Sequence, residues 1–457
     1  MMAPVRQLLR PWLARLVGDS DSLAMATSSM AGFAIRAAGV LLMTVVTVLF
    51  TRLMGAEEYG RLAFLLSGSF IIVLFAGLGL PTASNRLVPR YLARGRVEAA
   101  GHYLVLGLAV VALTAAAGGA AFAAAMSLLP GIFGEYRFPM LAIIGLVVTV
   151  ALMRFVSESS RGFGLSLAGF LAESITVRFL LLAALLTYLA AGLPLAAGPA
   201  LNLYVAAQAM AVVIVLVLVA RQVRLGRRSL RRRPWRLYRA WLGVSFVMLV
   251  TPVYYFLLFE TDIVLLGILA GPYEVGLYQV ARRLAELTVF CAGAASSVGL
   301  PRLARAHAER RQDRVQSTID VMTLISDGST GLVVLALVAV GPFALQIFGP
   351  EFAQGYPALI VLAFGRLAAV LLGPASDLLL MTGHHRRLGR VNLAFAILNL
   401  ALNLALIHWL GGLGAAIATC TASVSWSAWL YLMARRLTAI ETCPLRRLQR
   451  RQQALAG

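Results

Sequence analysis

Residues 201–220 read LNLYVAAQAMAVVIVLVLVA and contain no charged side chain. A helix of about 20 apolar residues is long enough to cross the hydrocarbon core of a lipid bilayer. The residues that follow, 221–239, include nine arginines. Because the cytosolic flanks of membrane spans are rich in basic residues, this pattern predicts a transmembrane helix whose C-terminal end faces the cytosol.

Composition extends this prediction to the whole chain. Of its 457 residues, 60% are hydrophobic and 13% are charged, and the mean hydropathy is +0.85. Soluble domains carry about 25% charged residues, so lipid has to cover much of this surface. The net charge is +21, and all 40 basic residues are arginine. In so apolar a chain this charge favours anionic membrane lipids over nucleic acid as a partner, and the absence of lysine excludes a P-loop ATP site.

Apolar runs of similar length recur along the sequence. We expect about twelve membrane-spanning helices, at residues 30–53, 62–80, 103–126, 138–156, 172–191, 201–220, 242–269, 275–298, 321–340, 359–379, 391–409 and 413–433. Most of the arginines outside these spans fall in loops on one side of the membrane, while the loops of the opposite side hold Arg52, Arg61 and Arg137. The distribution places the arginine-rich side and both termini in the cytosol.

The same pattern divides the chain into five segments. We expect a cytosolic amphipathic segment (1–27), an N-terminal six-helix bundle (28–220), a basic cytosolic linker (221–241), a C-terminal six-helix bundle (242–433) and a basic cytosolic tail (434–457). The opposite-side loops are all short, so no folded domain is expected outside the membrane.

The two predicted bundles share three short strings in the same order, at an offset close to 216 residues. The pairs are LMGAEEYG (53–60) with LAGPYEVG (269–276), GLP (79–81) with GLP (299–301), and FGEY (133–136) with FGPEF (348–352). Six spans separate the members of each pair, so the two halves have the same orientation in the membrane. Duplicated bundles of this kind are typical of transporters, whose substrate site lies between the halves.

These strings also carry a family resemblance. LFTRLMGAEEYGRLA (49–63) and DIVLLGILAGPYEVGLYQVARR (262–283) resemble span signatures of the polysaccharide flippases, which belong to the multidrug/oligosaccharidyl-lipid/polysaccharide exporter superfamily. FGPEFAQGYPAL (348–359) and the segment 399–418 fit the same family, so the resemblance covers essentially the whole chain. One departure is that the related lipid II flippases usually have two further C-terminal spans.

The resemblance implies a fold and a function. It implies an all-α membrane protein with two six-helix bundles around a central cavity that opens to alternate faces. The substrate it implies is an undecaprenyl-pyrophosphate-linked oligosaccharide, carried outward across a bacterial inner membrane for surface polysaccharides such as O-antigen or exopolysaccharide. A polysaccharide polymerase and other assembly proteins are the partners that such a role implies.

Ionisable residues inside the predicted spans are the candidate site. An arginine at the centre of a bilayer costs roughly 2.5–3.5 kcal/mol, so each one needs a partner or a ligand. We consider five arginines as candidate ligands of a pyrophosphate, whose oxygens match the guanidinium fork: Arg36, Arg178, Arg282, Arg283 and Arg366. Four acids are candidate charge partners or groups that couple transport to H⁺ or Na⁺: Glu260, Asp262, Glu286 and Asp377.

The arginines differ in the alternatives that remain open. Arg282 and Arg283 have Glu286 one turn away, so a local ion pair is an alternative to ligand binding. Arg36 lies near the cytosolic end of its span, where its side chain can also extend to the lipid headgroups. Arg178 and Arg366 lie near the middle of their spans, and we expect them to face a watery interior.

Two other functions compete with a flippase. A cation-coupled multidrug exporter of the same superfamily is expected to have an acid-rich cavity, whereas these spans hold mostly arginine. The other is a membrane enzyme such as an O-antigen ligase, polymerase or acyltransferase. The ligases and polymerases generally place their catalytic residues in a sizeable outer loop, and every outer loop expected here is short. The motif Asp19-Ser20-Asp21 matches the D-x-D of metal-dependent glycosyltransferases, but no folded domain surrounds it. We therefore expect no enzyme activity, no cofactor and no metal site.

Overall fold

The computed structural model describes residues 20–223, 235–249, 260–309, 311–438 and 440–443. Most of the predicted amphipathic segment, of the basic linker and of the basic tail lies outside these residues. Within the described ranges every regular element is a helix, and the apolar runs of the sequence account for where the long helices lie.

The first half of the chain forms the helices that precede the basic linker. They are α2 (Ser20–Ala76), α3 (Leu80–Leu92), α4 (Val97–Leu128), α5 (Pro130–Phe133), α6 (Met140–Gly162), α7 (Ser166–Leu171), the π-helix η1 (Ala172–Thr176), α8 (Val177–Ala190) and α9 (Ala197–Val223).

The second half follows the linker. Its elements are α10 (Trp235–Met248), α12 (Thr261–Leu269), α13 (Pro272–Ala285), α14 (Leu287–Ala308), α15 (Gln312–Gln346), the 3₁₀ helix η3 (Pro350–Gly355), α16 (Tyr356–Val370), α17 (Ala375–Met381) and α18 (His385–Thr438).

Two of these helices are each bent into two arms at a glycine. Gly55 in α2 has φ 75° and Gly411 in α18 has φ 53°, values that glycine adopts without the steric penalty that a Cβ brings. Each bend separates two predicted spans. Eight described helices are long and apolar enough to cross a membrane, and because α2 and α18 each hold two predicted spans, the eight account for ten of them.

The remaining two predicted spans correspond to shorter helices. The described parts of 242–269 are α10 and α12, and the predicted span 275–298 covers most of α13 and the first part of α14, which meet at Glu286. A helix junction inside an apolar run leaves no mark on hydropathy, which is why the sequence predicted one span there. The total of twelve spans stays a prediction.

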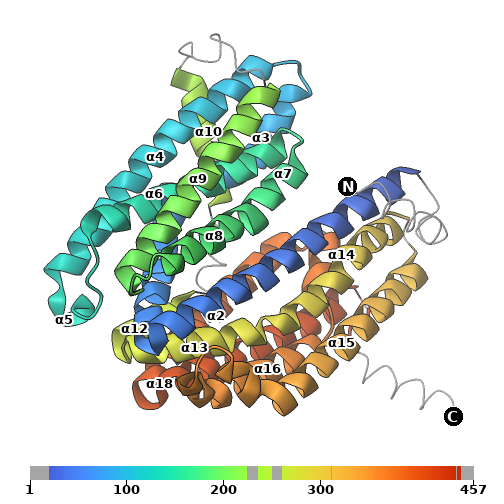
Figure 1. Ribbon diagram of the computed structural model, residues 1–457. Helices are drawn as coiled ribbons and strands as arrows, with labels where there is room; N and C mark the ends of the chain where they lie inside the picture. The colour runs from blue at the N-terminus through green and yellow to red at the C-terminus, as the bar shows by residue number, and fades with distance from the viewer. Residues whose placement is uncertain (1–19, 224–234, 250–259, 310, 439, 444–457) are drawn as a thin grey trace.

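The helices form two groups, as Figure 1 shows. One group contains α3, α4, α6, α8 and α9, and the other contains α13 to α18. The first arm of α2 lies along the second group, where α2 packs on α13 and α14. Conversely, α10 packs on α3 of the first group, and the Trp241 indole N–H donates a hydrogen bond to the Tyr91 hydroxyl at 2.7 Å. Both groups therefore hold a helix from the other half of the sequence.

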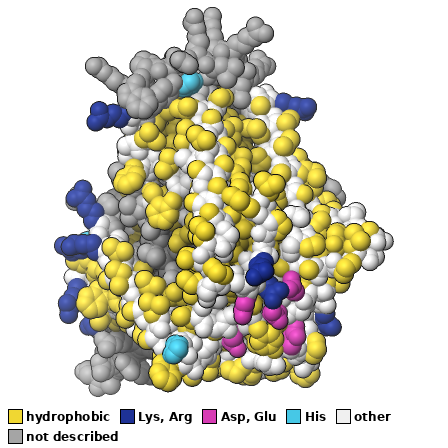
Figure 2. Space-filling view, turned by 90° about the vertical axis from the view of Figure 1, so that its left-hand side faces the viewer, with side chains coloured by type: hydrophobic (Ala, Val, Ile, Leu, Met, Phe, Trp, Pro, Cys, Tyr) yellow, Lys and Arg dark blue, Asp and Glu magenta, His cyan; other side chains and the backbone are white. Residues whose placement is uncertain are grey.

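Large apolar side chains remain exposed along the long helices. Leu113 of α4, Leu324 of α15 and Trp409 of α18 are 74%, 76% and 81% exposed. The face seen in Figure 2 is largely hydrophobic: basic side chains lie along its left and upper edges, and a group of basic and acidic side chains lies in its lower part. A contiguous apolar surface of this extent requires contact with lipid.

The repeat found in the sequence is also present in the backbone. Gly55 has φ 75° and ψ 178°, and its counterpart Gly271 has φ 86° and ψ 174°. The second pair of strings differs, because Gly79 precedes the start of α3 whereas Gly299 lies inside α14. The two halves thus share the turn between their first helices and diverge after the next span.

Candidate functional site

Arg282, in the last turn of α13, lies at the centre of a partly buried ion cluster. Its guanidinium contacts three carboxylates: Nη2 lies 3.0 Å from Glu260 Oε1, Nη1 lies 3.2 Å from Asp262 Oδ1, and Nε lies 3.4 Å from Glu286 Oε1. Arg283 contacts the second oxygen of Glu286 at 3.2 Å. All five charges come from the short stretch 260–286, which the repeat motif folds back on itself.

Local chain geometry brings these residues together. Glu260 and Asp262 lie at the start of α12, and the chain reverses at Gly271 so that α13 runs back beside α12. The Tyr278 hydroxyl, one turn before Arg282, donates a hydrogen bond to Asp262 Oδ2 at 2.6 Å. Asp262 is only 2% exposed, so its carboxylate is held by an arginine and a tyrosine in place of water.

The cluster also receives a group from the other half of the chain. The Ser67 hydroxyl, on the second arm of α2, donates a hydrogen bond to Glu260 Oε2 at 2.8 Å. Ser67 is buried, and the contact joins residues that are 193 positions apart. The cluster therefore lies at the boundary between the two halves.

Arg366 of α16 lies next to this cluster. It lines a small cavity together with Asp262, Arg282, Glu286 and Thr419. Gly365, the preceding residue, packs so closely against α18 that an added Cβ would lie 2.5 Å from the Cys420 sulfur. The close approach of α16 and α18 at this glycine fixes the position of Arg366 in the cavity wall.

Arg178, the first-half arginine, follows the π-helix η1 directly. Its Nη1 donates hydrogen bonds to the backbone oxygens of Ser174 and, at 3.5 Å, Glu173. Single π-turns of this kind are frequent at functional sites. Arg178 also packs on Gly39 of α2, where an added Cβ would lie 2.7 Å from Nη1. Its charge interacts with that of Arg283, so the arginines of the two halves approach each other.

The charges of the second-half cluster balance. Arg282, Arg283 and Arg366 face three carboxylates, those of Glu260, Asp262 and Glu286. A phosphate that binds these arginines must therefore compete with carboxylates already in place. The additional positive charge near the cluster comes from the first half, through Arg178.

The structure adds one membrane arginine that the sequence analysis missed. Arg154 of α6 lies inside the predicted span 138–156, and its guanidinium carbon is 5.3 Å from the centre of the Phe70 ring. Its Nη1 is buried and has no hydrogen-bond partner within the described part of the chain. The signal that identified the other five, an arginine inside an apolar run, applies equally to Arg154.

The remaining two candidates are Arg36 and Asp377. Arg36 belongs to α2, but its side chain is not among the described ones. Asp377 of α17 accepts a hydrogen bond of 2.7 Å from Ser296 of α14, which is a separate contact. Among the residues that the structure describes, no group of His, Cys, Asp or Glu side chains could hold a metal ion.

At the end of the molecule where Gly55, Gly271 and Gly411 lie, the two halves are in direct contact. An added Cβ at Gly60 would lie 1.8 Å from the Pro272 carbonyl oxygen, and one at Gly276 would lie 2.0 Å from that of Ala56. Ala56 and Pro272 are themselves counterparts at the offset of 216, so the two contacts are the same contact made twice. Only glycine permits so close an approach of two backbones.

Polar bonds reinforce this contact, which we call the outer seal (Ala56, Gly60, Pro272 and Gly276). The Arg52 side chain donates to the carbonyl oxygens of Ile347 (2.7 Å) and Gln346 (2.9 Å). Glu351 accepts from the Ala56 amide at 2.6 Å, and the Tyr136 hydroxyl donates to the Gly267 carbonyl at 2.8 Å. The seal closes the end of the protein that the arginine distribution predicts to be periplasmic.

The repeated glutamates have matching partners inside each half. Glu58 accepts from the amide of Ala197, the first residue of α9, at 2.8 Å. Its counterpart Glu274 accepts from the amide of Gly412, which begins the second arm of α18, at 2.9 Å. Glu58 thus caps the start of α9 and Glu274 the start of the second arm of α18, so the spacing that the two halves share has a structural cause.

The polysaccharide biosynthesis protein family model matches residues 30–307, more than half of the chain. The chain belongs to this family. The MatE family model matches residues 248–405. Membership in the multidrug/oligosaccharidyl-lipid/polysaccharide exporter superfamily, which the repeated strings indicated, is therefore confirmed.

Comparison with individual proteins gives one curated relative and several solved structures that are similar to this chain. The probable low-salt glycan biosynthesis flippase Agl15 of Haloferax volcanii is 28% identical over 166 residues, which are 35% of this chain and 34% of that protein. The chain thus matches about a third of that relative's length.

The solved structures have the same fold. The lipid II flippase MurJ in an inward closed conformation gives a TM-score of 0.68 at 13% identity, covering 89% of this chain and 87% of that one. An inward-facing multidrug resistance MATE family transporter gives 0.66 at 16% identity, covering 87% and 94%. The predicted class, an all-α membrane protein of two helix bundles, is confirmed for this member of the polysaccharide biosynthesis protein family.

Proposed function

We propose that this protein moves an undecaprenyl-pyrophosphate-linked oligosaccharide from the cytosolic to the periplasmic leaflet of a bacterial inner membrane by alternating access. The transport serves surface polysaccharide biosynthesis and changes no covalent bond. The observation that carries the proposal is the set of partly buried arginines at the boundary of the two halves, Arg178, Arg282, Arg283 and Arg366. A pyrophosphate is the part of such a substrate that requires cations inside a membrane.

The closed outer seal corresponds to the state in which an outward transporter takes up its substrate. With this end shut, the substrate enters from the arginine-rich end, which the positive-inside rule assigns to the cytosol together with both termini. Export then requires the seal to open while the opposite end closes.

The balanced charges suggest how binding is linked to movement. A pyrophosphate that takes Arg366 or Arg283 as a ligand displaces a carboxylate such as Glu286 from its arginine. A displaced carboxylate in a membrane interior has to bind a cation, and H⁺ or Na⁺ is the candidate. Substrate and coupling ion would in this way occupy one charge cluster in turn.

A second candidate function is cation-coupled export of drugs. Its support is the MatE match over residues 248–405 together with the three carboxylates around Arg282. A drug exporter makes the cell resistant to cationic compounds that inhibit growth, whereas a flippase does not. Loss of the gene should leave such resistance unchanged under the flippase proposal.

The proposed function is tested by depleting the protein and locating its substrate. We expect lipid-linked repeat units to be assembled but held on the cytosolic leaflet, with surface polysaccharide lost. In proteoliposomes, the purified protein should bring a fluorescently labelled lipid-linked oligosaccharide within reach of an enzyme on the opposite side. Normal surface polysaccharide after depletion, or formation or cleavage of glycosidic bonds by the pure protein, would reject the proposal.

A further inference from the structure

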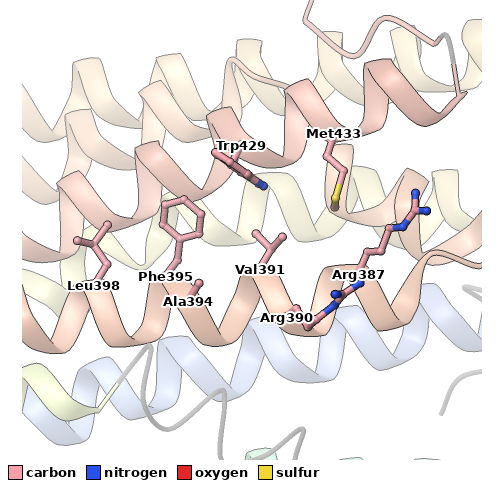
Figure 3. Close-up of a pocket in the computed structure, with 8 residues that line it drawn as sticks. All are labelled: Arg387, Arg390, Val391, Ala394, Phe395, Leu398, Trp429 and Met433. Atoms are coloured by element: carbon pink, nitrogen blue, oxygen red, sulfur yellow. The ribbon is translucent and has the colours of Figure 1, made fainter.

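A groove unconnected to the arginine cluster runs between the two arms of α18. Its volume is about 580 Å³. The first arm contributes residues three or four positions apart, from Arg387 and Arg390 to Leu398, so they share one helix face. The second arm contributes Trp429 and Met433, which face them across the groove in Figure 3.

Charge and apolar surface are separated along this groove. Figure 3 shows Arg387 and Arg390 at one end, with Phe395 and Leu398 toward the other. The Phe395 and Trp429 rings lie 6.4 Å apart, one from each arm. The groove therefore offers cations at one end and an aromatic and aliphatic wall over the rest, which is the complement of an anionic amphiphile.

The two arginines are free to bind such a molecule. Both are exposed, and α18 contains no acidic residue anywhere between His385 and Thr438. Within the described part of the chain no carboxylate pairs with Arg387 or Arg390, in contrast to Arg282. Two adjacent guanidinium groups without a counter-charge favour a phosphate.

The length of the groove distinguishes between kinds of lipid. Leu398 lies eleven positions after Arg387, about 16 Å along a helix. The hydrocarbon core of a bilayer is about 30 Å thick, so the groove is as long as one leaflet is deep. An acyl chain of a leaflet lipid fits this length, whereas a long polyprenyl chain exceeds it.

We propose that this groove is a binding site for an anionic glycerophospholipid of the leaflet at the arginine-rich end. The phosphate accepts hydrogen bonds from Arg387 and Arg390, and one acyl chain lies along Phe395 and Leu398 beneath Trp429. The site does not depend on the proposed transport function, and the bound lipid joins the two arms of α18 at the end remote from their bend.

Native mass spectrometry of the full-length protein in mild detergent, with phosphatidylglycerol as the probe, tests the site. The variant Arg387→Gln/Arg390→Gln should bind phosphatidylglycerol at least about tenfold more weakly. The loss of a single hydrogen bond to a charged group is enough to raise the Kd by about that factor. Arg86→Gln/Arg90→Gln, which removes two arginines from α3, is the matched control and should bind as the wild type does. Ala394→Trp, which fills the groove without changing charge, should weaken binding as well.

The location of the lipid is read from Trp429 in a variant whose other tryptophans are phenylalanine. In nanodiscs of phosphatidylcholine, brominated phosphatidylglycerol should quench Trp429 more than brominated phosphatidylcholine at the same fraction. Equal quenching by both lipids would overturn the proposal, as would equal phosphatidylglycerol retention in the arginine pair variant and the wild type. Displacement of phosphatidylglycerol by a polyprenyl phosphate at equal concentration would also overturn it, in favour of a substrate tail.

Discussion

Substitutions of Arg366 can distinguish a ligand role of this side chain from a structural role. It lines the cavity that Arg282 and Glu286 also line. If it binds pyrophosphate, Arg366→Gln should keep normal membrane abundance and abolish polysaccharide export. Arg366→Lys should retain part of the activity, because lysine keeps the charge but loses the bidentate fork. Immunoblots of membranes and staining of surface polysaccharide measure the two quantities.

Arg137→Gln is the control for this experiment, since Arg137 is exposed in a loop on the predicted outer side. It should alter neither abundance nor export. A structural ion pair at Arg366 would instead reduce the amount of folded protein in the Gln variant, and full export with full abundance would contradict both roles.

Arg282 and Asp262 should differ in their effect on stability. Arg282→Met leaves three carboxylates without their common partner, and an uncompensated buried charge costs about 3–5 kcal/mol. Asp262→Asn should cost less, because Arg282 keeps Glu260 and Glu286 and the Asn side chain can still accept from Tyr278. Thermal unfolding in detergent, followed by fluorescence size-exclusion chromatography, should rank Arg282→Met well below Asp262→Asn. The reverse order would show that Asp262, and not Arg282, holds the cluster together.

Sequence reasoning at this scale identified charged residues better than their partners. Arg282, Arg366 and Arg178 stand out because an arginine inside an apolar run is costly. Ser67 could not be found this way, since an isolated serine in a span has no such cost and Glu260 is 193 residues away. Arg154 was missed although its position inside the run 138–156 carries the same signal.

At the scale of elements, the outer seal depends on two glycines. A methyl group at Gly60 or Gly276 would meet a carbonyl oxygen at 1.8 or 2.0 Å, so Gly60→Ala and Gly276→Ala should force the two halves apart at this end. We expect export to fall and the outer end to open. Ser67→Cys, in a chain whose native cysteines are serine, reports the opening, because Ser67 is buried and lies seven positions after Gly60 on the second arm of α2. A membrane-impermeant maleimide added from outside should label it faster in either glycine variant.

Gly131→Ala is the matched substitution, because nothing lies within 4 Å of an added Cβ at Gly131. Labelling should remain at the wild-type rate in this variant. Unchanged labelling in Gly60→Ala and Gly276→Ala, with normal export, would mean that the seal adjusts to the methyl groups without opening.

Element boundaries followed the apolar runs where those runs end at glycine. The turns at Gly55 and Gly411 fall between predicted spans, because a positive φ and the change of direction both favour glycine there. The predicted span 275–298 did not reveal the junction of α13 and α14 at Glu286. The local pairing of Glu286 with Arg282 and Arg283 could be read from their spacing, but such a spacing also fits an unbroken helix and so does not indicate a junction.

For the whole molecule, topology provides the remaining prediction. Reporter fusions ending near Gly134, Gly198, Gly271, Phe348 and Gly411 should report the periplasm. Fusions near Arg94, Arg231, Arg310 and His385 should report the cytosol, because these loops contain most of the arginines. A periplasmic signal at Arg231 would refute the proposed orientation, since the run 221–239 carries its strongest support.

The fold class could be predicted from the sequence because lipid imposes a simple rule on length and hydropathy. The duplication could be predicted because the turn at Gly55 and the turn at Gly271 need the same residues. The exchange of helices between the groups, with α10 on α3 and the first arm of α2 on α13, could not. Apolar helices carry no sequence mark of which neighbour they pack against.

The outer seal also has an evolutionary consequence. Ala56 meets Gly276 while Gly60 meets Pro272, the reciprocal exchange that a two-fold symmetric dimer makes between identical subunits. A single half carries both surfaces, so two copies of an ancestral half could form this contact before any gene fusion joined them. Position 272 records the later divergence: the Ala56 amide is bonded to Glu351, whereas proline has no amide hydrogen to offer Glu135, the corresponding glutamate of the first half.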